Sequence, residues 1–382
     1  MQAVQDTKSQ YPHGMLPATT AEEFSRQEFV KSLKFHLATK VAPGNRVAFA
    51  AKNVPAGTYR EVGNVMRTDP YFRFWSALQR NSQEMMWKAT QLPVERQLPE
   101  LIAASDRSGR KLGSLTLDPA LEIPRYHRAV DIHCMPGGYH TEFTANDVGN
   151  GAVYDRAVYL YAMGRMGPLN SDIGDTTIGY VRQHFPELKP RRILDLGCTV
   201  GHSTLPYVDA FPDAQVYAID VGAPVLRYAH ARAEALGKRV HFSQQNAETT
   251  NFPDGHFDLI ASHILVHETS HAAVRRIMRE CYRLLTPGGV VIHAETPPYR
   301  DLSPFDAFML DWDTRNNNEP FWGASHEIEP REIASQTGFS AASAFEGMHP
   351  SAFDEAEARR TRVFQGGDFG GGGMWYVWGA RK

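Results

Sequence analysis

The chain has 382 residues, of which 42% are hydrophobic and 22% are charged, and its formal net charge is −3. This composition indicates a folded protein of about two domains and excludes disordered and collagen-like chains. The small net charge predicts no broad surface for nucleic acid or for an acidic membrane.

The absence of targeting patterns and the spacing of the cysteines indicate where the protein is located. No apolar run approaches the roughly 20 residues that cross a bilayer, and the start of the chain lacks the layout of a secretion signal. The three cysteines lie far apart in sequence, so they predict neither a disulfide framework nor a CxxC metal pair. We therefore expect a cytoplasmic protein with no membrane partner.

The first third of the chain predicts helices. Residues 22–40 and 69–92 carry apolar and aromatic residues at helical spacing, and a proline stands at the start of the second segment. We expect residues 1–130 to form a mainly helical domain. Residues 131–189, rich in glycine and tyrosine, are expected to connect this domain to the next one.

From about Pro190 onward, short apolar runs alternate with helical patterns, which predicts a mostly parallel, doubly wound sheet. Strands are predicted at "RRILDLG", "AQVYAID", "VHFSQQN", "FDLIASHI" and "GGVVIHAE". The last two strands, "GFSAASAFEG" and "GMWYVWGARK", have no helix between them, so we expect them to be antiparallel. The glycine-rich residues 366–373 belong to the connection between them. Together these runs predict a seven-stranded, Rossmann-like α/β fold.

The stretch "RRILDLGCTVGHST", residues 191–204, leads from the first of these strands into a helix. Asp195, Gly197 and Gly201 stand where glycines let the backbone turn sharply and approach a ligand. Asp220 ends the second strand, 19 residues after Gly201, where a carboxylate can accept both hydroxyls of a ribose. Thr199 replaces the middle glycine of such loops. We expect its hydroxyl to cap the first helical turn, the alternative being a variant without functional meaning.

These features resemble the class I S-adenosylmethionine-dependent methyltransferases over about residues 150–382. The resemblance also rests on "GAVYDRAVYLY", "NAE", "FPDGHFDLI", "LLTPGGVVI" and "MWYVWGARK". It implies S-adenosyl-L-methionine as cofactor, with the glycine loop on its methionine part, Asp220 on its ribose and Asn246 near its adenine. The expected cofactor-binding residues are Asp195, Gly197, Thr199, Gly201, Asp220, Asn246, Ala247, Tyr154 and His263. A structural hydrogen bond at the strand end is the alternative role of His263.

The resemblance also implies a reaction. "ILVHETSHAAV" is similar to the segment of small-molecule O-methyltransferases that carries the general base, which makes His267 the expected base and Glu268 or Glu295 its orienting acid. A hydroxyl acceptor needs such a base, and the expected acceptor is a small molecule methylated at oxygen. Sulfur, nitrogen and carbon acceptors remain open, as does a cofactor-binding protein without methyl transfer. A dinucleotide oxidoreductase would normally carry Gly-x-Gly-x-x-Gly instead.

The remaining segments are assigned to the substrate side. The methyltransferase domain is expected over residues 131–382, with 131–189 as a lid segment and 301–328 as a substrate-side insertion. The expected substrate residues are His133, Tyr139, Trp312 and Trp322, although plain core packing explains the tryptophans equally well. The resemblance further implies that residues 1–130 cover the substrate or form a homodimer. No basic stripe is present, so no nucleic-acid partner is expected.

"HETSH", residues 267–271, also fits the zinc motif His-Glu-x-x-His. A catalytic zinc needs a third protein ligand, and the motif has no His-x-x-Gly-x-x-His continuation. We therefore expect no metal, and a zinc hydrolase is a remote alternative.

Overall fold

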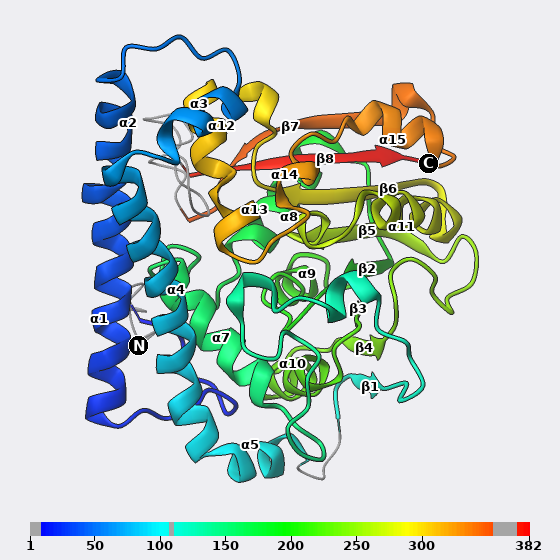
Figure 1. Cartoon of the computed structure of the whole chain (residues 1–382). Coiled ribbons are helices and arrows are strands. Elements are labelled where there is room, and N and C mark those ends of the chain that lie inside the picture. Colours follow the sequence, from blue (N-terminus) through cyan, green and yellow to red (C-terminus); the bar gives the residue numbers. More distant parts are fainter. Residues whose placement is uncertain (1–8, 107–110, 354–372) are drawn as a thin grey trace, which may run out of the picture.

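The computed structural model describes residues 9–106, 111–353 and 373–382, and its central feature is an eight-stranded sheet in the order β1-β4-β3-β2-β5-β6-β8-β7 (Figure 1). The strands are β1 (Ser114–Thr116), β2 (Arg192–Leu196), β3 (Gln215–Asp220), β4 (His241–Gln244), β5 (Phe257–His263), β6 (Leu285–Glu295), β7 (Ala344–Pro350) and β8 (Met374–Arg381). Only β8 runs antiparallel to its neighbours. The predicted doubly wound α/β fold is confirmed. Most of the predicted glycine-rich connection, residues 366–373, lies outside the described residues.

The eighth strand, β1, comes from the segment that was predicted to be helical. It pairs in parallel with β4 at the edge of the sheet. The carboxylate of Glu234 accepts the backbone N–H groups of Leu112 and Gly113 at 2.8–3.0 Å, which holds the chain in place just before the strand. A three-residue strand is too short to show a period of two, so its sequence gave no signal.

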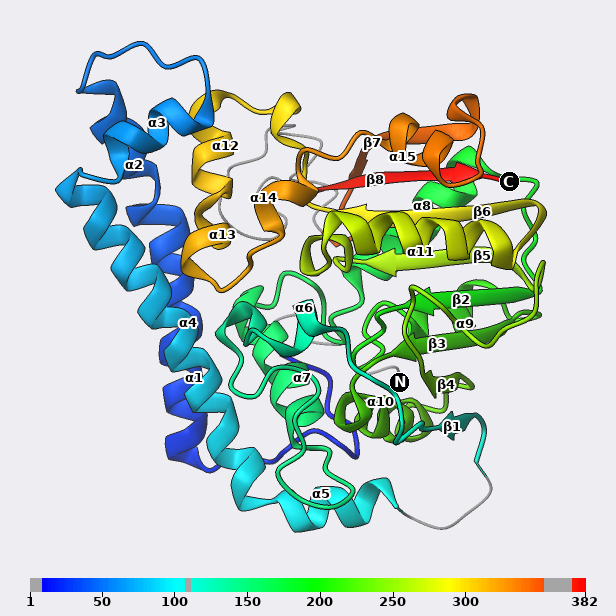
Figure 2. The same cartoon turned by 45° about the vertical axis from the view of Figure 1, so that its right-hand side comes forward.

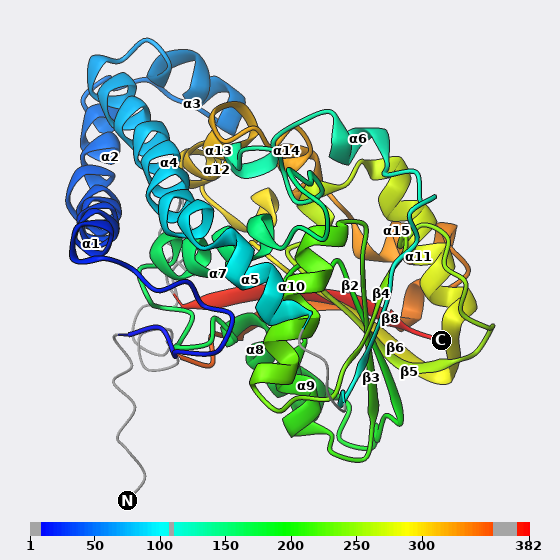
Figure 3. The ribbon, with the colours of Figure 1, turned by 90° about the horizontal axis from the view of Figure 1, so that it is seen from below.

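Helices cover both faces of the sheet. α8 (Asp172–His184), α9 (Leu205–Ala210) and α10 (Ala223–Ala235) lie on one face, and α11 (His271–Leu284) and α15 (Pro330–Gln336) lie on the other (Figures 2 and 3). In α11 the Ser270 side chain accepts the N–H of Ala273, and such a cap contributes about 1 kcal/mol. Its apolar residues recur every three or four positions and are buried against the sheet.

The N-terminal helices stand beside the carboxyl ends of the parallel strands (Figure 1). They are α1 (Ala21–His36), a π-helical turn (Leu37–Val41), α2 (Pro43–Ala50), α3 (Tyr59–Met66), α4 (Pro70–Arg96) and α5 (Leu98–Ser105). Capping boxes start α1 at Thr20 and α3 at Thr58, and Asp69 caps α4. α1 and α4 pack against α7 (Gly149–Tyr161). These helices therefore enclose the edge of the sheet at which the parallel strands end.

The segment after β6 completes this enclosure with α12 (Pro304–Leu310), α13 (Trp312–Asn316) and α14 (Trp322–Ser325). α12 packs on α3, and the two regions share one buried apolar cluster: Val62, Met66, Phe72, Trp75, Phe305, Phe308, Met309 and Trp312. Over the described ranges, no helix combines the length and the apolar character required to cross a membrane.

Candidate active site

The loop between β2 and α9 has an alternating backbone. Gly197, Thr199 and Gly201 have φ values of 67°, 47° and 78°, so every second residue is left-handed. A Cβ on Gly197 would lie 2.7 Å from Cδ1 of Leu265, so the end of that side chain would have to shift to accommodate it. The loop therefore keeps its backbone close to the end of β5, and the positive φ of Gly197 favours glycine there.

Thr199 does not have the predicted capping role. α9 begins at Leu205, and its N-cap makes no side-chain bond, so Thr199 lies well before the first helical turn. The left-handed region costs an ordinary residue roughly 1–2 kcal/mol. Here the backbone N–H of Thr199 donates to Oδ2 of Asp220 at 3.0 Å, which offsets part of this cost. Thr199 thus adopts the conformation of the glycine it replaces, and the capping prediction was wrong.

Asp220 ends β3 as predicted and is 9% exposed. Its Oδ1 accepts the backbone N–H of Gly222 at 2.8 Å, while Oδ2 accepts that of Thr199. Burial raises the pKa of the Asp220 carboxyl, and the two N–H bonds oppose this shift. The carboxylate is thereby fixed at the wall of a pocket, where it can accept further donors from a ligand.

Two adjoining pockets lie along the carboxyl ends of β2, β3 and β5. Both are lined by Tyr154, Gly197, Thr199, His263 and Ile264. The first extends toward the N-terminal helices and is further lined by Asp195, His133, Trp87 and Met86 among others. The second extends along β3 and β4 and is further lined by Asp220, Asn246, Ala247, Tyr139 and Glu268 among others. The structure therefore brings most of the predicted cofactor residues together.

Some predicted residues do not line these two pockets: Gly201, His267, Glu295, Trp312 and Trp322. Trp312 is 4% exposed and packs edge-on against Trp75 at 5.8 Å, and its Nε1 donates to Ser76. Trp322 contacts the His267 ring at 4.8 Å and donates its Nε1–H to the Leu310 carbonyl. Both tryptophans thus lie in packed surroundings, Trp322 directly beside the expected base.

His263 makes the structural bonds that were considered as its alternative role. Its Nδ1 lies 3.1 Å from Oδ1 of Asp195, and its Nε2 lies 3.2 Å from the Tyr207 hydroxyl. The hydroxyl of Thr204 donates to the other oxygen of Asp195 at 2.5 Å. These bonds connect the ends of β2 and β5 beneath the glycine loop.

Asn246 and its neighbours form the wall below Asp220. The side-chain carbonyl of Asn246 accepts the backbone N–H of Glu248 at 2.9 Å, which leaves that oxygen one lone pair for a ligand. Tyr126 donates its hydroxyl to Glu248 at 2.9 Å, and His127 stacks on Tyr139 at 5.6 Å. Tyr126 and His127 line this pocket but come from the segment assigned to the N-terminal domain, and no motif marks them.

His267 is held in one orientation by Glu295. Its Nδ1 lies 2.7 Å from Oε2 of Glu295, whose Oε1 accepts the Val266 N–H at 2.8 Å. The His267 ring is fully buried, and its Nε2 has no hydrogen-bond partner. Burial favours the neutral ring, but Glu295 and then Glu319 outweigh it and raise the pKa of His267. Of the two predicted orienting acids, Glu295 is the one bonded to His267.

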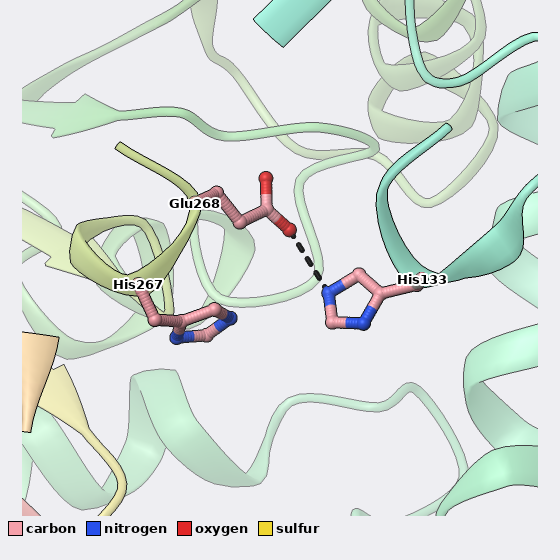
Figure 4. A group of neighbouring side chains, drawn as sticks. All are labelled: His133, His267 and Glu268. Atoms are coloured by element: carbon pink, nitrogen blue, oxygen red, sulfur yellow. Dashed lines mark hydrogen bonds and ion pairs between the residues drawn. The ribbon is translucent and has the colours of Figure 1, made fainter. Parts of the chain in front are cut away.

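Glu268, the next residue in sequence, bonds to a different ring. Its Oε1 lies 3.0 Å from Nε2 of His133 (Figure 4). The same oxygen accepts the Tyr139 hydroxyl at 2.9 Å. Nδ1 of His133 lies 2.8 Å from Oε1 of Glu319. Burial favours the neutral ring, but Glu319 and Glu268 together hold the pKa of His133 well above its usual value. An imidazolium clamped between two carboxylates therefore stands beside His267.

Glu319 was not anticipated from the sequence. It is 1% exposed, and its Oε2 is unpartnered and lies 3.8 Å from Nε2 of His267. Asn317 donates to Oε1 of Glu319 at 2.8 Å. The surrounding "NNNEP" has the composition of a polar loop, and only the tertiary fold brings it to His267.

The segment that carries His133 has an unusual backbone conformation. His133 and Cys134 have φ values of 56° and 58°, and Gly137 and Gly138 have values of 78° and 58°. Non-glycine residues in this region cost of order 1–3 kcal/mol each when the surroundings hold them there. Here Gln83 and Trp87 of α4 donate to the His133 carbonyl at 3.2 and 2.8 Å. The N-terminal helices thus hold this segment against the first pocket.

The two histidines of "HETSH" do not converge. His267 lies in a 3-10 turn (Val266–Glu268), whereas His271 begins α11 and bonds the Ala324 carbonyl through Nε2 at 2.7 Å. A different set, His133, His267 and Glu268, has its possible ligand atoms within 4.8 Å of one another (Figure 4). Ligand atoms around a tetrahedral zinc lie about 3.4 Å apart, as bonds of 2.0–2.1 Å require. Both nitrogens of His133 already bond carboxylates, so hydrogen bonding accounts for this cluster.

A buried carboxylate behind the glycine loop was also not anticipated. Asp155 of α7 is fully buried and bonds Nε2 of His13 at 2.9 Å, Nε2 of His202 at 2.7 Å and the Tyr228 hydroxyl at 2.8 Å. Nε of Arg232 lies 3.3 Å away. His202 lines the first pocket, so this network connects residues near the start of the chain to the glycine loop.

Comparison with known proteins agrees with this architecture. Residues 193–289 match the model of a methyltransferase domain. The demethylmenaquinone methyltransferase of Thermus thermophilus is 37% identical over 112 residues, covering 29% of this chain and 50% of the relative. The ajmaline N-methyltransferase of Rauvolfia serpentina is 33% identical over 133 residues, covering 34% and 44%. The chain thus spans about half the length of the curated relatives it matches.

Solved structures give weaker likenesses. Phosphoethanolamine N-methyltransferase 2 of Haemonchus contortus is 18% identical with a TM-score of 0.42, covering 60% of this chain and 57% of that one. A Nostoc punctiforme protein, provisionally assigned as an O-methyltransferase, is 14% identical with a TM-score of 0.45, covering 94% and 96%.

The strand order, the glycine loop, the strand-end acid and the domain match define the class. The chain contains a class I S-adenosylmethionine-dependent methyltransferase domain. Its relatives carry names with different acceptors, so these names do not decide which acceptor this chain takes.

Proposed function

We propose that this protein transfers a methyl group from S-adenosylmethionine to a hydroxyl oxygen of a small molecule, with His267 as general base. The observation that carries this proposal is the buried His267 ring, fixed by Glu295 through Nδ1, with its Nε2 unpartnered. An oriented imidazole with one free nitrogen is the arrangement that proton abstraction requires.

The residues around the two pockets fit the cofactor. Gly197 leaves no side chain between the loop and a ligand, and the fixed Asp220 carboxylate offers lone pairs to a ribose. Asn246 and Ala247 line the place expected for an adenine. His127 adds an unpartnered buried Nε2 on the same wall. S-adenosylmethionine, when bound, supplies an electrophilic methyl group on a positive sulfur.

His267 would act through its Nε2. Its Nδ1–H donates to Glu295, so the lone pair of Nε2 is free to take the proton of an acceptor hydroxyl. The ring then becomes positive, and Glu319, 3.8 Å from Nε2, and Glu295 stabilise that charge. The main part of the rate enhancement comes from holding acceptor and methyl group in line.

Access to the base depends on the segment around His133. His133 lines the first pocket, whereas His267 does not, and the two rings are in edge contact at 5.9 Å. The backbone of residues 131–143 supports a lid, because it has left-handed residues at both ends of the turn and a Gly-Gly pair. We infer that this lid moves when the acceptor enters, with His133 and Tyr139 on the substrate side.

The remaining assignments follow from the same features. The three cysteines are free and buried, which supports a reducing compartment such as the cytoplasm. The first 130 residues enclose the site, which supports a role as a substrate cover. Exposed aromatic residues on α1, Phe24, Phe29 and Phe35, support a homodimer through the same helices.

The test uses labelled S-adenosylmethionine and a pool of extracted metabolites. The parent protein should transfer label to a product whose new bond mass spectrometry identifies as an O-methyl group. His267→Ala should lose this transfer, and His271→Ala, the other histidine of the motif, should keep it. Cofactor binding without any transfer by the parent would contradict the enzymatic proposal. An S-methyl or N-methyl product with full activity in His267→Ala would reject both the oxygen acceptor and the base.

A further inference from the structure

A third pocket lies apart from the two pockets at the sheet edge. Here a pocket of about 390 Å³ opens between α4 and the α12–α13 region. Four arginines line it: Arg67 at the end of α3, Arg73 and Arg80 on α4, and Arg315 on α13. Arg73 and Arg80 are seven residues apart and therefore share a face of their helix. Four cations from three elements thus surround one hollow.

The charges of these arginines are incompletely balanced. Asp311 is the one carboxylate among the described residues that line the pocket, and it lies 3.9 Å from Arg67. Tyr299 and Thr314 already donate to its Oδ1 at 3.0 and 2.9 Å. Burial, and after it the nearby charge of Arg315, lowers the pKa of Arg67. The positive charges of Arg67 and Arg315 therefore repel each other across the pocket.

Two of the guanidinium groups have donors to spare. Arg315 makes no hydrogen bond or ion pair with any described residue, and Arg73 uses only Nε, which donates to the Arg67 carbonyl at 2.9 Å. Arg80, in contrast, is engaged by Glu84 at 2.7 Å and by the Asn316 carbonyl at 2.8 Å. Free guanidinium forks match the paired oxygens of phosphate and carboxylate groups.

The floor of the pocket is aromatic. Phe72, Phe308 and Trp312 line it and belong to the buried cluster between α3, α4 and α12. Such a floor adds apolar contact for a flat or hydrocarbon group next to the anion. A surface that only kept the protein soluble would expose its charges singly and would not gather them over aromatic rings.

We propose that this pocket binds an organic anion, a molecule with a phosphate or carboxylate group joined to an apolar or aromatic part. The oxygens contact Arg73 and Arg315, and the apolar part lies on Phe72, Phe308 and Trp312. The pocket also reaches the active-site network: Arg80 holds the Asn316 carbonyl, and the next residue, Asn317, donates to Glu319. The ligand is either a remote part of the methyl acceptor or a separate molecule.

Phenyl phosphate is a suitable probe because it carries both features, and phenol lacks the anion. Calorimetric titration of the full chain should show saturable binding of phenyl phosphate and much weaker binding of phenol. Arg73→Gln combined with Arg315→Gln should weaken phenyl phosphate binding at least about tenfold, because each substitution removes a charge-assisted hydrogen bond to the phosphate. Arg279→Gln with Arg331→Gln, two exposed arginines on α11 and α15, makes the same charge change and should bind like the parent.

Three results would overturn the proposal: no saturable binding by the parent, equal binding by the Arg73/Arg315 variant, or equal loss in the Arg279/Arg331 control. Tighter binding of a single-stranded RNA oligonucleotide, lost in the same variant, would also overturn it in favour of a nucleic-acid surface. Arg315→Gln alone breaks no hydrogen bond or ion pair among the described residues, so a binding defect in this variant with an unchanged Tm is not due to misfolding. The source of the anion follows from labelled methyl transfer to the metabolite pool. Competition by phenyl phosphate supports a part of the acceptor, and unchanged or increased transfer supports a separate ligand.

Discussion

Glu268 follows His267 directly in sequence, yet its carboxylate bonds His133, whose Nε2 lies 3.0 Å from Oε1 of Glu268. The site therefore contains two histidine–carboxylate units, His267 with Glu295 and His133 with Glu268 and Glu319. The first has a free ring nitrogen, and the second has both ring nitrogens engaged. This difference separates a ring suited to accept a proton from a ring suited to hold a charge.

The first prediction concerns the pH dependence of the rate. The pKa of His267 is raised, so the neutral, proton-accepting ring forms only above its ordinary value of about 6.5, and turnover should rise with pH through that higher range. Glu295→Gln removes the largest raising neighbour, so the rising limb should move to lower pH and turnover should fall about 10–100-fold. Glu268→Gln, one residue from the base, should move the limb less. Identical pH profiles in all three proteins would exclude His267 as the titrating base.

A second prediction concerns stability. The folded-state pKa of His133 is raised, so its charged ring contributes stability that is complete below the unfolded pKa of about 6.5 and disappears as the pH rises through the folded pKa. His133→Gln should therefore lower Tm more near pH 6 than at alkaline pH, because each charge-assisted bond lost near pH 6 lowers the free energy of unfolding by about 1.5–3 kcal/mol. His36→Gln, an exposed control on α1, should show no such pH-dependent difference. A constant difference in Tm across the pH range would mean that the ring carries no charge.

Cofactor binding gives a third prediction. Asp220→Ala removes the fixed carboxylate, and each lost charge-assisted ribose bond costs about 1.5–3 kcal/mol, which is roughly 10–100-fold in affinity. Calorimetry with S-adenosylhomocysteine should detect this loss. Asp209→Ala, which removes an exposed carboxylate paired with Lys238, should bind like the parent. Normal affinity in Asp220→Ala would place the ribose elsewhere.

The fourth prediction is that methyl transfer needs no metal ion. Hydrogen bonds occupy both ring nitrogens of His133, and the histidines of "HETSH" point to different partners. Elemental analysis of the purified protein should find only substoichiometric zinc, and a chelator should leave turnover unchanged. One equivalent of zinc together with loss of activity on chelation would show that His133, His267 and Glu268 are ligands after all.

The last prediction concerns assembly. Phe29 and Phe35 of α1 are 58% and 52% exposed, which favours a dimer through this helix. Light scattering should give twice the chain mass for the parent and the single mass for Phe29→Glu combined with Phe35→Glu. Phe143→Glu, at a residue 65% exposed in a loop, should remain dimeric. A monomeric parent would contradict the dimer and leave the N-terminal helices only as a cover.

Local patterns were sufficient to predict most of the sheet and the glycine loop at its edge. Neighbouring residues determine the hydrophobic period of each strand and helix. The carboxyl ends of parallel strands meet at one edge of the sheet, which places Gly197 beside Asp220. Thr199 was misjudged because the start of α9 lies five residues later than the pattern indicated. β1 was missed because three residues show no period.

The partners of the acids could not be predicted in the same way. Successive residues of a 3-10 turn point in different directions, so the sequence could not show that Glu268 would bond His133 and not the adjacent His267. Glu319 reaches His267 only because α13 and the following loop fold back over the sheet edge. Both contacts are long-range in sequence, and no local rule encodes them.

The Asp155 network has a practical consequence for shortened forms of this protein. Gln10 and His13 bond a buried carboxylate that also bonds Tyr228 and His202, and His202 lines the first pocket. A version that begins after Met15 would remove two of the partners of this anion, and a buried charge that loses partners destabilises the protein. Loss of cofactor affinity in such a version would therefore report an interior defect at Asp155, and it would say nothing about whether the helices that follow take part in catalysis. Deletions that probe those helices need to keep residues 10–15 in place.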